Sequence, residues 1–429
     1  MKLRLSLLLL FLLALSACSL GQVSTAAPTP PEIPPTETAS LLPAATDNTP
    51  DQPVNAPVTL HIWVPPQFDP AAGTPAGDLL QARLDEFTTR RSGIRIEVRV
   101  KEVEGPGGML DTLTTASAAA PLALPDLVAL PRHPLEVAAI KGQLHSYEGL
   151  STTLDEPDWY EYARQLAHVQ DSSFGMPFAG DALMLVYRPA AVPTPPTDWS
   201  TSLAITNTLV FPAADPQALY TLSLYQSTGA VLLDENGRPT LETIQLTEVY
   251  TYYRQAATSN LMPYWLTQYQ TDAQSWQAFT EQQADLAITW ASRYLQAPPG
   301  DSSGAPIPTA TGEAYTLATG WAWALASPDP ERQALSAQLA EFLTTSAFLA
   351  EWSAAAGYLP PRPSALATWQ SSTLQNLMSQ IAVAAKLIPS REVVATVGPI
   401  LQKGTVDVLK AQEDPLLAAE AAAAQLAGP

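Results

Sequence analysis

The sequence predicts an α/β fold of two lobes joined by strands that cross between them. The chain has 429 residues, enough for two domains with full hydrophobic cores. Strand-like and helix-like segments alternate from residue 58 onward, which is typical of a mostly parallel sheet with right-handed crossovers. Residues 319–327 then form a strand pattern with one bulky face and one all-alanine face, as expected of a strand buried on both sides.

The composition argues against several classes of function. Charged residues make up 14% of the chain, against roughly 25% in an average protein. The formal net charge is -20, from 41 acidic and 21 basic residues, which disfavours nucleic acid and a basic membrane-surface patch. Four scattered His residues and one Cys provide no zinc-ligand set and no disulfide within the chain. We therefore expect no metal and no cofactor.

The N-terminus has the pattern of an export signal. A short basic start is followed by an apolar run at residues 5–15, which is too short for a spanning helix. The sequence Leu15-Ser-Ala-Cys18 resembles a bacterial lipobox, so residues 1–18 are expected to be a lipoprotein signal peptide, with the lipid on Cys18. The alternative is a signal peptide cut nearby, with an incidental Cys18. Residues 19–57 are rich in Pro, Thr and Ala and are expected to be a disordered tether.

The first half of the folded region alternates strands with helices. Val58 opens an alternating strand, and the strands at 94–101 and 125–130 follow in turn. A helix beginning at Gly77-Asp78 and further helices at 109–120 and 135–141 lie between and after these strands. Ligands of such sheets bind at the loops beyond the carboxyl ends of the strands. Those loops contain Gln67, Phe68 and Arg132.

The second half is predicted from the same kind of patterns. The strand at 181–187 and the linker at 190–198 are expected to make the first crossing, and residues 319–327 are expected to make the return. Gly320 would let another backbone come close to the returning strand. Between the crossings we expect strands at 203–211 and 284–290 and helices at 217–228, 240–259 and 273–283. Helices at 331–352, 364–387 and 393–409 follow, and Asp414-Pro415 opens the last one.

Four segments give the chain a resemblance to bacterial extracellular solute-binding protein family 1, the sugar-type binding proteins of ABC importers. They are Leu124 to Leu130, Phe174-Gly-Met-Pro-Phe178 with the strand that ends at Tyr187-Arg188, Ala284 to Trp290, and Gly320 to Ser327 leading to Gly357-Tyr-Leu-Pro360. The resemblance implies a periplasmic-binding-protein type II fold with crossing strands at the hinge. Lobe 1 would comprise residues 58–187 and 321–356, and lobe 2 residues 188–320 and 357–429.

The resemblance also implies a function and a site. It implies a monomeric, lipid-anchored protein on the outer face of the cell membrane that captures a small solute. A carbohydrate is the expected class of solute. The protein would deliver this solute to the transmembrane permease subunits of an ABC importer. Transferred by position, the ligand-contacting residues would be Gln67, Phe68, Arg132, Phe178, Asp181, Trp290, Ser292, Arg293 and Trp321.

The residue types suit a sugar, although each has a plainer interpretation. Indoles such as Trp290 and Trp321 can stack on the apolar faces of pyranose rings, or they can simply pack in the core, as we expect of Trp323. Arg132 and Arg293 can bind a carboxylate or a pair of hydroxyls, or can be solvated at the surface. Asp181 can accept bonds from sugar hydroxyls, or can form a salt bridge or a cap.

An enzyme is the competing class. Asp155, Glu156 and Asp158 are clustered, as a glycosidase would need, but beside Pro157 and Trp159 they have the pattern of a loop that leads into a helix. The sequence shows no Gly-x-Ser-x-Gly elbow between a strand and a helix, because Gly300-Asp-Ser-Ser-Gly304 lies in a Pro/Gly-rich loop. It has no His-Glu-x-x-His or phosphate-loop motif and few His residues. We therefore predict no catalytic residue. A ligand-sensing or adhesive surface lipoprotein without transport remains the alternative.

Overall fold

The computed structural model describes residues 57–427, so the predictions for the signal peptide, for Cys18 and for nearly all of the tether lie outside the described residues. The described part contains a nine-stranded mixed sheet. Its main strand order is β2-β1-β3-β10-β6-β8-β7, and off this path β11 pairs with β10 and β9 pairs with β6. The strands are β1 (Val58–Val64), β2 (Ile94–Val100), β3 (Leu127–Pro131), β6 (Met176–Tyr187), β7 (Leu209–Val210), β8 (Leu286–Trp290), β9 (Ser303–Ala305), β10 (Thr316–Leu325) and β11 (Ala385–Leu387).

The first half of the chain forms the predicted alternation. β1 pairs in parallel with β2 and with β3, with Ile62 opposite Leu127. The helices that connect and follow these strands are α1 (Pro75–Arg90), α2 (Met109–Ala119), α3 (Arg132–Ile140) and α4 (Glu161–Ala167). Every strand and helix predicted up to residue 141 is confirmed, with boundaries shifted by three residues or fewer. A two-stranded hairpin of β4 (His168–Val169) and β5 (Ser172–Ser173) precedes the first crossing strand.

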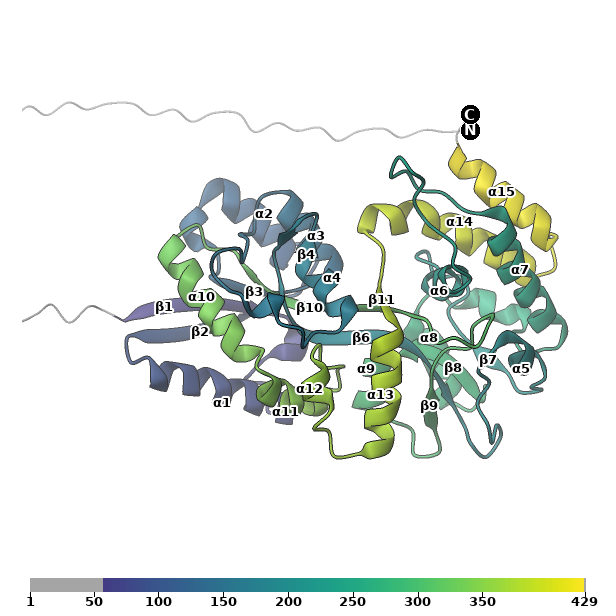
Figure 1. The fold of residues 1–429 in the computed structure, drawn as a ribbon, viewed down its shortest axis with the longest axis horizontal. Coiled ribbons are helices and arrows are strands. Elements are labelled where there is room, and N and C mark those ends of the chain that lie inside the picture. The colour runs from purple at the N-terminus through teal and green to yellow at the C-terminus, as the bar shows by residue number, and fades with distance from the viewer. Residues whose placement is uncertain (1–56, 428–429) are drawn as a thin grey trace, which may run out of the picture. The chain divides into compact units, whose positions relative to one another are not determined.

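Two long strands connect the halves of the sheet (Figure 1). β10 lies between β3 and β6 and runs antiparallel to both, and β6 continues beside β8 and β9. The sheet is therefore mixed rather than mostly parallel, because its crossing strands run against their neighbours. Trp323 and Leu325 enter one hydrophobic core, whereas Ala322 and its alternate neighbours enter a second core on the opposite face. The predicted α/β fold with crossing strands is confirmed, because β6 and β10 link the two halves of one sheet.

The second half contains α5 (Trp199–Leu203), α6 (Leu219–Ser227), α7 (Thr243–Thr258), α8 (Asp272–Thr280) and α9 (Ala291–Gln296). The prediction of one strand at 203–211 was wrong. Asp198 begins a short helix with a capping box, accepting a hydrogen bond from the Thr201 N–H, and α5 ends at Leu203. The strand itself is limited to Leu209–Val210, which pairs in parallel with β8.

The C-terminal helices divide more often than the sequence pattern indicates. The expected helix at 331–352 is two helices, α10 (Pro330–Leu343) and α11 (Ser346–Ala356). Thr344 lies between them, and its hydroxyl donates to the Ala340 carbonyl oxygen and to the Met176 sulfur. The expected helix at 364–387 is α12 (Pro363–Leu366), α13 (Ser372–Ala384) and then strand β11. α14 (Arg391–Leu409) and α15 (Pro415–Ala427) complete the chain. Over residues 57–427, none of the helices is both long and apolar enough to cross a membrane.

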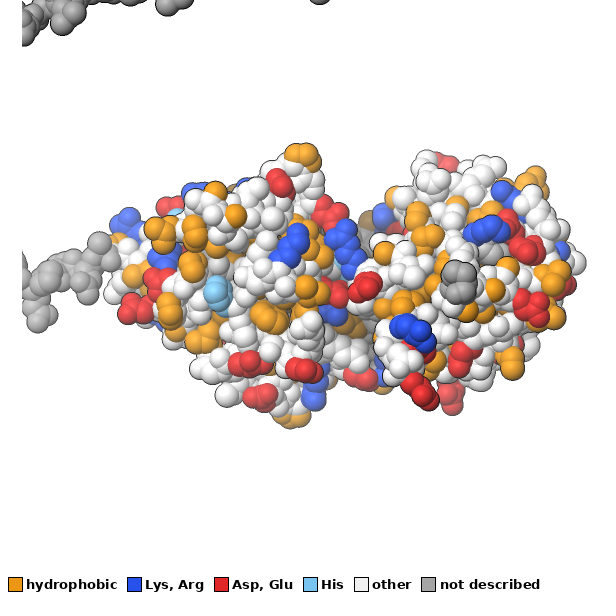
Figure 2. All heavy atoms as spheres, turned by 90° about the horizontal axis from the view of Figure 1, so that it is seen from above, with side chains coloured by type: hydrophobic (Ala, Val, Ile, Leu, Met, Phe, Trp, Pro, Cys, Tyr) orange, Lys and Arg blue, Asp and Glu red, His pale blue; other side chains and the backbone are white. Residues whose placement is uncertain are grey.

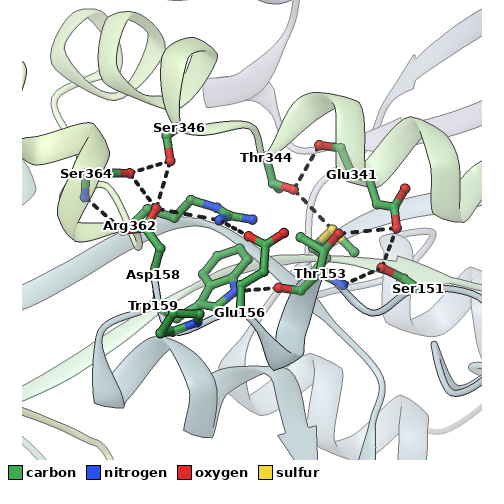
Figure 3. A network of polar contacts seen from close by, with 12 residues as sticks. Ser151, Thr153, Glu156, Asp158, Trp159, Glu341, Thr344, Ser346, Arg362 and Ser364 are labelled. Carbon is green, nitrogen blue, oxygen red and sulfur yellow. Dashed lines mark hydrogen bonds and ion pairs between the residues drawn. The ribbon is translucent and has the colours of Figure 1, made fainter.

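A polar network holds the segment that follows α11 (Figure 3). The Arg362 guanidinium is 3.9 Å from the centre of the Trp159 ring, and its Nη1 lies 2.6 Å from a Glu156 carboxylate oxygen. Asp158 accepts bonds from the Ser364 N–H at 3.0 Å and from the Ser346 hydroxyl at 2.9 Å. Residues 151–159 are thereby joined to the start of α11 and to α12.

Candidate functional site

The loops that follow β1 and β3 meet at the crossing strand β10. The 3-10 turn Pro66–Phe68 follows β1, and Trp321 of β10 pairs with Pro131 at the end of β3. The Phe68 and Trp321 rings are 5.0 Å apart between centroids, in an edge-on arrangement. Gln67 is exposed and Trp321 is half-buried, so an amide and an indole are available on this side.

Two of the predicted aromatic residues lie behind this surface. Phe68 and Phe178 are 3% and 2% exposed, and their ring centroids are 5.1 Å apart. Phe178 also stacks on Trp323 at 4.5 Å, and Trp323 lies in the core as expected. In this conformation Phe68 packs against Trp321 and Phe178 packs behind Phe68, so neither ring presents its own face.

Arg132 begins α3 directly after β3. Its Nη1 donates a hydrogen bond to the His168 carbonyl oxygen at 3.0 Å, and burial lowers the pKa of the guanidinium. This contact directs the guanidinium group toward the β4–β5 hairpin. The structure therefore gives Arg132 a backbone partner within its own half of the molecule.

Asp181 connects the crossing strand β6 to the segment that follows β8. Its carboxylate accepts a hydrogen bond from the Ser292 N–H at 2.9 Å and one from the Ser292 hydroxyl at 2.5 Å. Burial raises the pKa of Asp181 to about 7, although the hydrogen bonds from Ser292 act in the opposite direction. Both oxygens are engaged, so the carboxylate holds the start of α9 against β6.

Trp290 and Trp321 lie on opposite edges of β6, on the same face of the sheet. Trp321 is opposite Ala179, and Trp290 is opposite Leu183. These partners are four residues apart along β6, which corresponds to about 13 Å. Asp181 lies between them on the same face, because side chains alternate along a strand. Both indoles are half-buried.

Trp290 lines a pocket of about 240 Å³ at the carboxyl ends of β7 and β8. Acidic, amide and aromatic side chains converge there, as in sites that bind polar small molecules. The Arg293 guanidinium forms an ion pair with the Asp272 carboxylate beside the pocket, so these two charges are neutralised. The lining residues are Leu183, Pro212, Asp215, Gln217, Leu219, Tyr220, Gln270, Thr271, Asp272, Ile288 and Trp290.

The polar residues of this pocket were not among the predicted ligand contacts. Asp215 and Gln217 follow β7, and Thr271 and Asp272 open α8. Because ligands of such sheets bind beyond strand ends, the end of the strand pattern near residue 211 is the signal that could have indicated Asp215 and Gln217. Gln270 and Asp272 carry no such signal, because they lie at the start of helix α8 rather than after a strand.

The surface is hollowed between the two halves on the face that Figure 2 shows, with acidic and basic side chains at the borders of the hollow. Residues 82–378 match a family model described as bacterial extracellular solute-binding protein. The chain belongs to this family. The predicted membership is confirmed, and members of the family are binding proteins rather than enzymes.

No sequence relative is found among curated proteins.

Solved structures of other solute-binding proteins share the fold. The sugar-binding protein MalE of Xanthomonas citri has a TM-score of 0.70 at 18% identity and covers 86% of this chain and 96% of its own. The cyclic α-maltosyl-1,6-maltose binding protein of Arthrobacter globiformis also has a TM-score of 0.70 at 18% identity, covering 86% and 98%. Maltose-bound MalE3 of T. maritima has a TM-score of 0.64 at 17% identity, covering 86% and 99%.

Proposed function

We propose that this solute-binding protein captures a carbohydrate between its two lobes. The observation that carries the proposal is the half-buried indole of Trp290, which lines a pocket together with Asp215, Gln217 and Asp272. A sugar needs a flat apolar surface for its ring face and hydrogen-bonding partners for its hydroxyls. The similar structures include proteins for maltose, maltotetraose and a cyclic maltosyl-maltose, which supports this ligand class.

The proposed ligand cavity has two walls. Trp290, Ser292 and Arg293 belong to one wall, and Gln67 and Trp321 belong to the other. We assign lobe 1 to residues 58–187 and 321–356, and lobe 2 to residues 188–320 and 357–429. The pairing of β11 with β10 adds a third stretch of chain at the hinge.

The proposal extends to delivery. The extracellular family supports a location outside the cytoplasm, and the Leu15-Ser-Ala-Cys18 sequence supports a lipid on Cys18 at the outer face of the membrane. The partner would be the transmembrane subunits of an ABC importer, to which a monomer presents its loaded cleft. The protein would bind its solute without converting it.

A thermal-shift screen tests the proposal. A carbohydrate at 100 times its dissociation constant should stabilise the protein by about 2.7 kcal/mol if it binds only the folded state. Maltose, maltotriose and maltotetraose should be compared with polyols and amino acids. Trp290→Ala should abolish the shift, whereas Trp199→Ala, which removes a half-buried indole of α5, should keep it. A shift that survives Trp290→Ala unchanged would contradict the proposed site.

A further inference from the structure

A larger cavity lies away from the strand-end loops, between α11 and the segment that joins α12 to α13. Its volume is about 620 Å³, within the range of about 300–1,000 Å³ typical of small-molecule sites. The lining residues are Ala347, Ala350, Glu351, Ala354, Thr368, Trp369, Gln370, Ser371 and Leu374. The binding mode proposed above uses none of them.

The two walls of this cavity are held by the backbone. Ala347, Ala350 and Ala354 recur at helical spacing, so one face of α11 is small and leaves room. On the other wall, the backbone N–H of Trp369 donates to the Leu366 carbonyl oxygen at 3.1 Å. Ser371 caps α13. The indole therefore stands on a fixed turn opposite a recessed helix face.

The chemistry of the lining indicates an uncharged, hydroxyl-rich ligand. Trp369 is half-buried and offers apolar ring surface, while Thr368, Gln370 and Ser371 are exposed and offer hydroxyls and an amide. Glu351 is the one charged side chain in the lining, and it is exposed. A carboxylate repels anions but accepts hydrogen bonds from neighbouring sugar hydroxyls.

The cavity continues along α13. A neighbouring pocket of about 310 Å³ shares Ser371 and Leu374 with it and extends to Tyr294 of α9 and to Gly304 of β9. Tyr294 lies two residues beyond Ser292, on the short helix that Asp181 holds. The combined space suits a chain of several sugar units better than a single ring.

We propose that the groove between α11 and residues 368–374 is a second carbohydrate-binding site, with Trp369 as the stacking surface and Glu351 and Gln370 as hydroxyl partners. This inference rests on the proposed carbohydrate function, but it concerns a different place in the molecule. It predicts two binding events per chain for an oligosaccharide, one dependent on Trp290 and one dependent on Trp369.

Calorimetric titration of the full chain with maltotetraose and with cellotetraose tests this. The wild type should bind two molecules of an accepted tetrasaccharide, and Trp290→Ala should bind one. Adding Trp369→Leu to Trp290→Ala should weaken the remaining event at least tenfold. Adding Trp199→Leu instead, as the matched loss of a half-buried indole, should leave that event unchanged.

Two milder variants keep the test informative if Trp369→Leu disturbs the fold. Ala354→Phe, at an exposed position, should fill the groove and remove the second event. Glu351→Gln should weaken it, whereas Glu420→Gln, on an exposed face of α15, should not. A single event that is lost on Trp290→Ala and unaffected by Ala354→Phe would overturn the second site and leave the cleft proposal standing. Binding that depends on Trp369 but not on Trp290 would overturn the cleft proposal and leave the second site standing. No binding by the wild type or any variant would overturn both.

Discussion

Asp181 brings a carboxyl group into the middle of a strand that is buried on both faces. Burial raises its pKa from 3.8 to about 7 in the folded protein. Between pH 4 and pH 7 the folded state therefore binds more protons at this group than the unfolded state does. The stability that this group provides is fully present below pH 4 and is lost as the pH rises to 7. The loss is on the order of 4 kcal/mol, since one pKa unit corresponds to about 1.4 kcal/mol.

Asp181→Asn removes this titration. We expect the free energy of unfolding of the wild type, relative to the variant, to fall between pH 4 and pH 7 and to level off above pH 7. Urea unfolding at several pH values measures the difference. Ser292→Ala removes the hydroxyl donor to Asp181 but keeps the N–H donor, so it should raise the pKa of Asp181 further. A constant difference between wild type and Asp181→Asn across this range would contradict the assignment.

The sequence indicated which residues could take part in a site, but not which residues they contact. The sequence indicated Asp181 on an apolar strand and Ser292 after another strand, but their contact spans 111 positions and depends on how β6 and β8 pair. Arg132 is similar, because its partner is the backbone oxygen of His168 in a hairpin that the sequence pattern did not reveal. The strand patterns indicated where Trp290 and Trp321 lie along the chain, whereas the face they share follows from the register.

Gly320 lies where the backbones of β10 and β6 are close together. A Cβ at this position would be 2.6 Å from the Ala179 carbonyl oxygen on β6 and 2.8 Å from Leu166 Cδ2. The oxygen belongs to a paired strand and cannot move easily, so Gly320→Ala should cost about 1–3 kcal/mol of stability. Gly300→Ala is the matched control, because a Cβ there meets nothing within 4 Å. Denaturant midpoints compare the two variants. Equal midpoints would contradict the prediction, because the β10 and β6 backbones would then make room for the added methyl group without loss of stability.

The connection after α11 depends on Arg362. This residue is 5% exposed, and its guanidinium stacks over Trp159 (Figure 3). Arg362→Ala removes this stacking and the ion pair with Glu156, and we expect a loss of about 2 kcal/mol. Lys403→Ala, which removes an exposed i,i+4 pair on α14, should cost no more than about 0.5 kcal/mol. Thermal unfolding measures both. Similar small losses would indicate that α12 is held by its apolar contacts alone.

Elements were predictable where local pattern and tertiary environment agree. β1 begins and ends where its alternation predicts, and the two faces of β10 separate into bulky and small as expected. Two of the errors lie where the chain contacts a crossing strand. The helix pattern at 331–352 continues through Thr344, whose hydroxyl hydrogen-bonds to Met176 of the crossing strand. The pattern after α13 gives no indication of β11, because β11 exists only by pairing with β10.

At the scale of the whole molecule, the halves are joined by few chain passages. β6 and β10 pass between them side by side, with β11 along the edge of β10, so relative rotation of the halves would bend these strands (Figure 1). Such hinges close on ligand when the ligand contacts both walls. A carbohydrate that touches Trp290 on one wall and Gln67 on the other would therefore favour a closed form.

Electron-spin distance measurement tests this closure directly. The only Cys in the sequence is Cys18, so a protein spanning residues 55–429 has no native thiol, and Arg99→Cys on β2 with Glu420→Cys on α15 provides two exposed label sites in opposite halves. A saturating oligosaccharide that gives a thermal shift should shorten the distance between the labels, because both walls must approach the ligand. With Trp290→Ala the same ligand should leave the distance unchanged. If the ligand binds to the wild type without any change in the distance distribution, then it occupies a preformed pocket on one lobe, and the crossing strands act as a rigid joint rather than as a hinge.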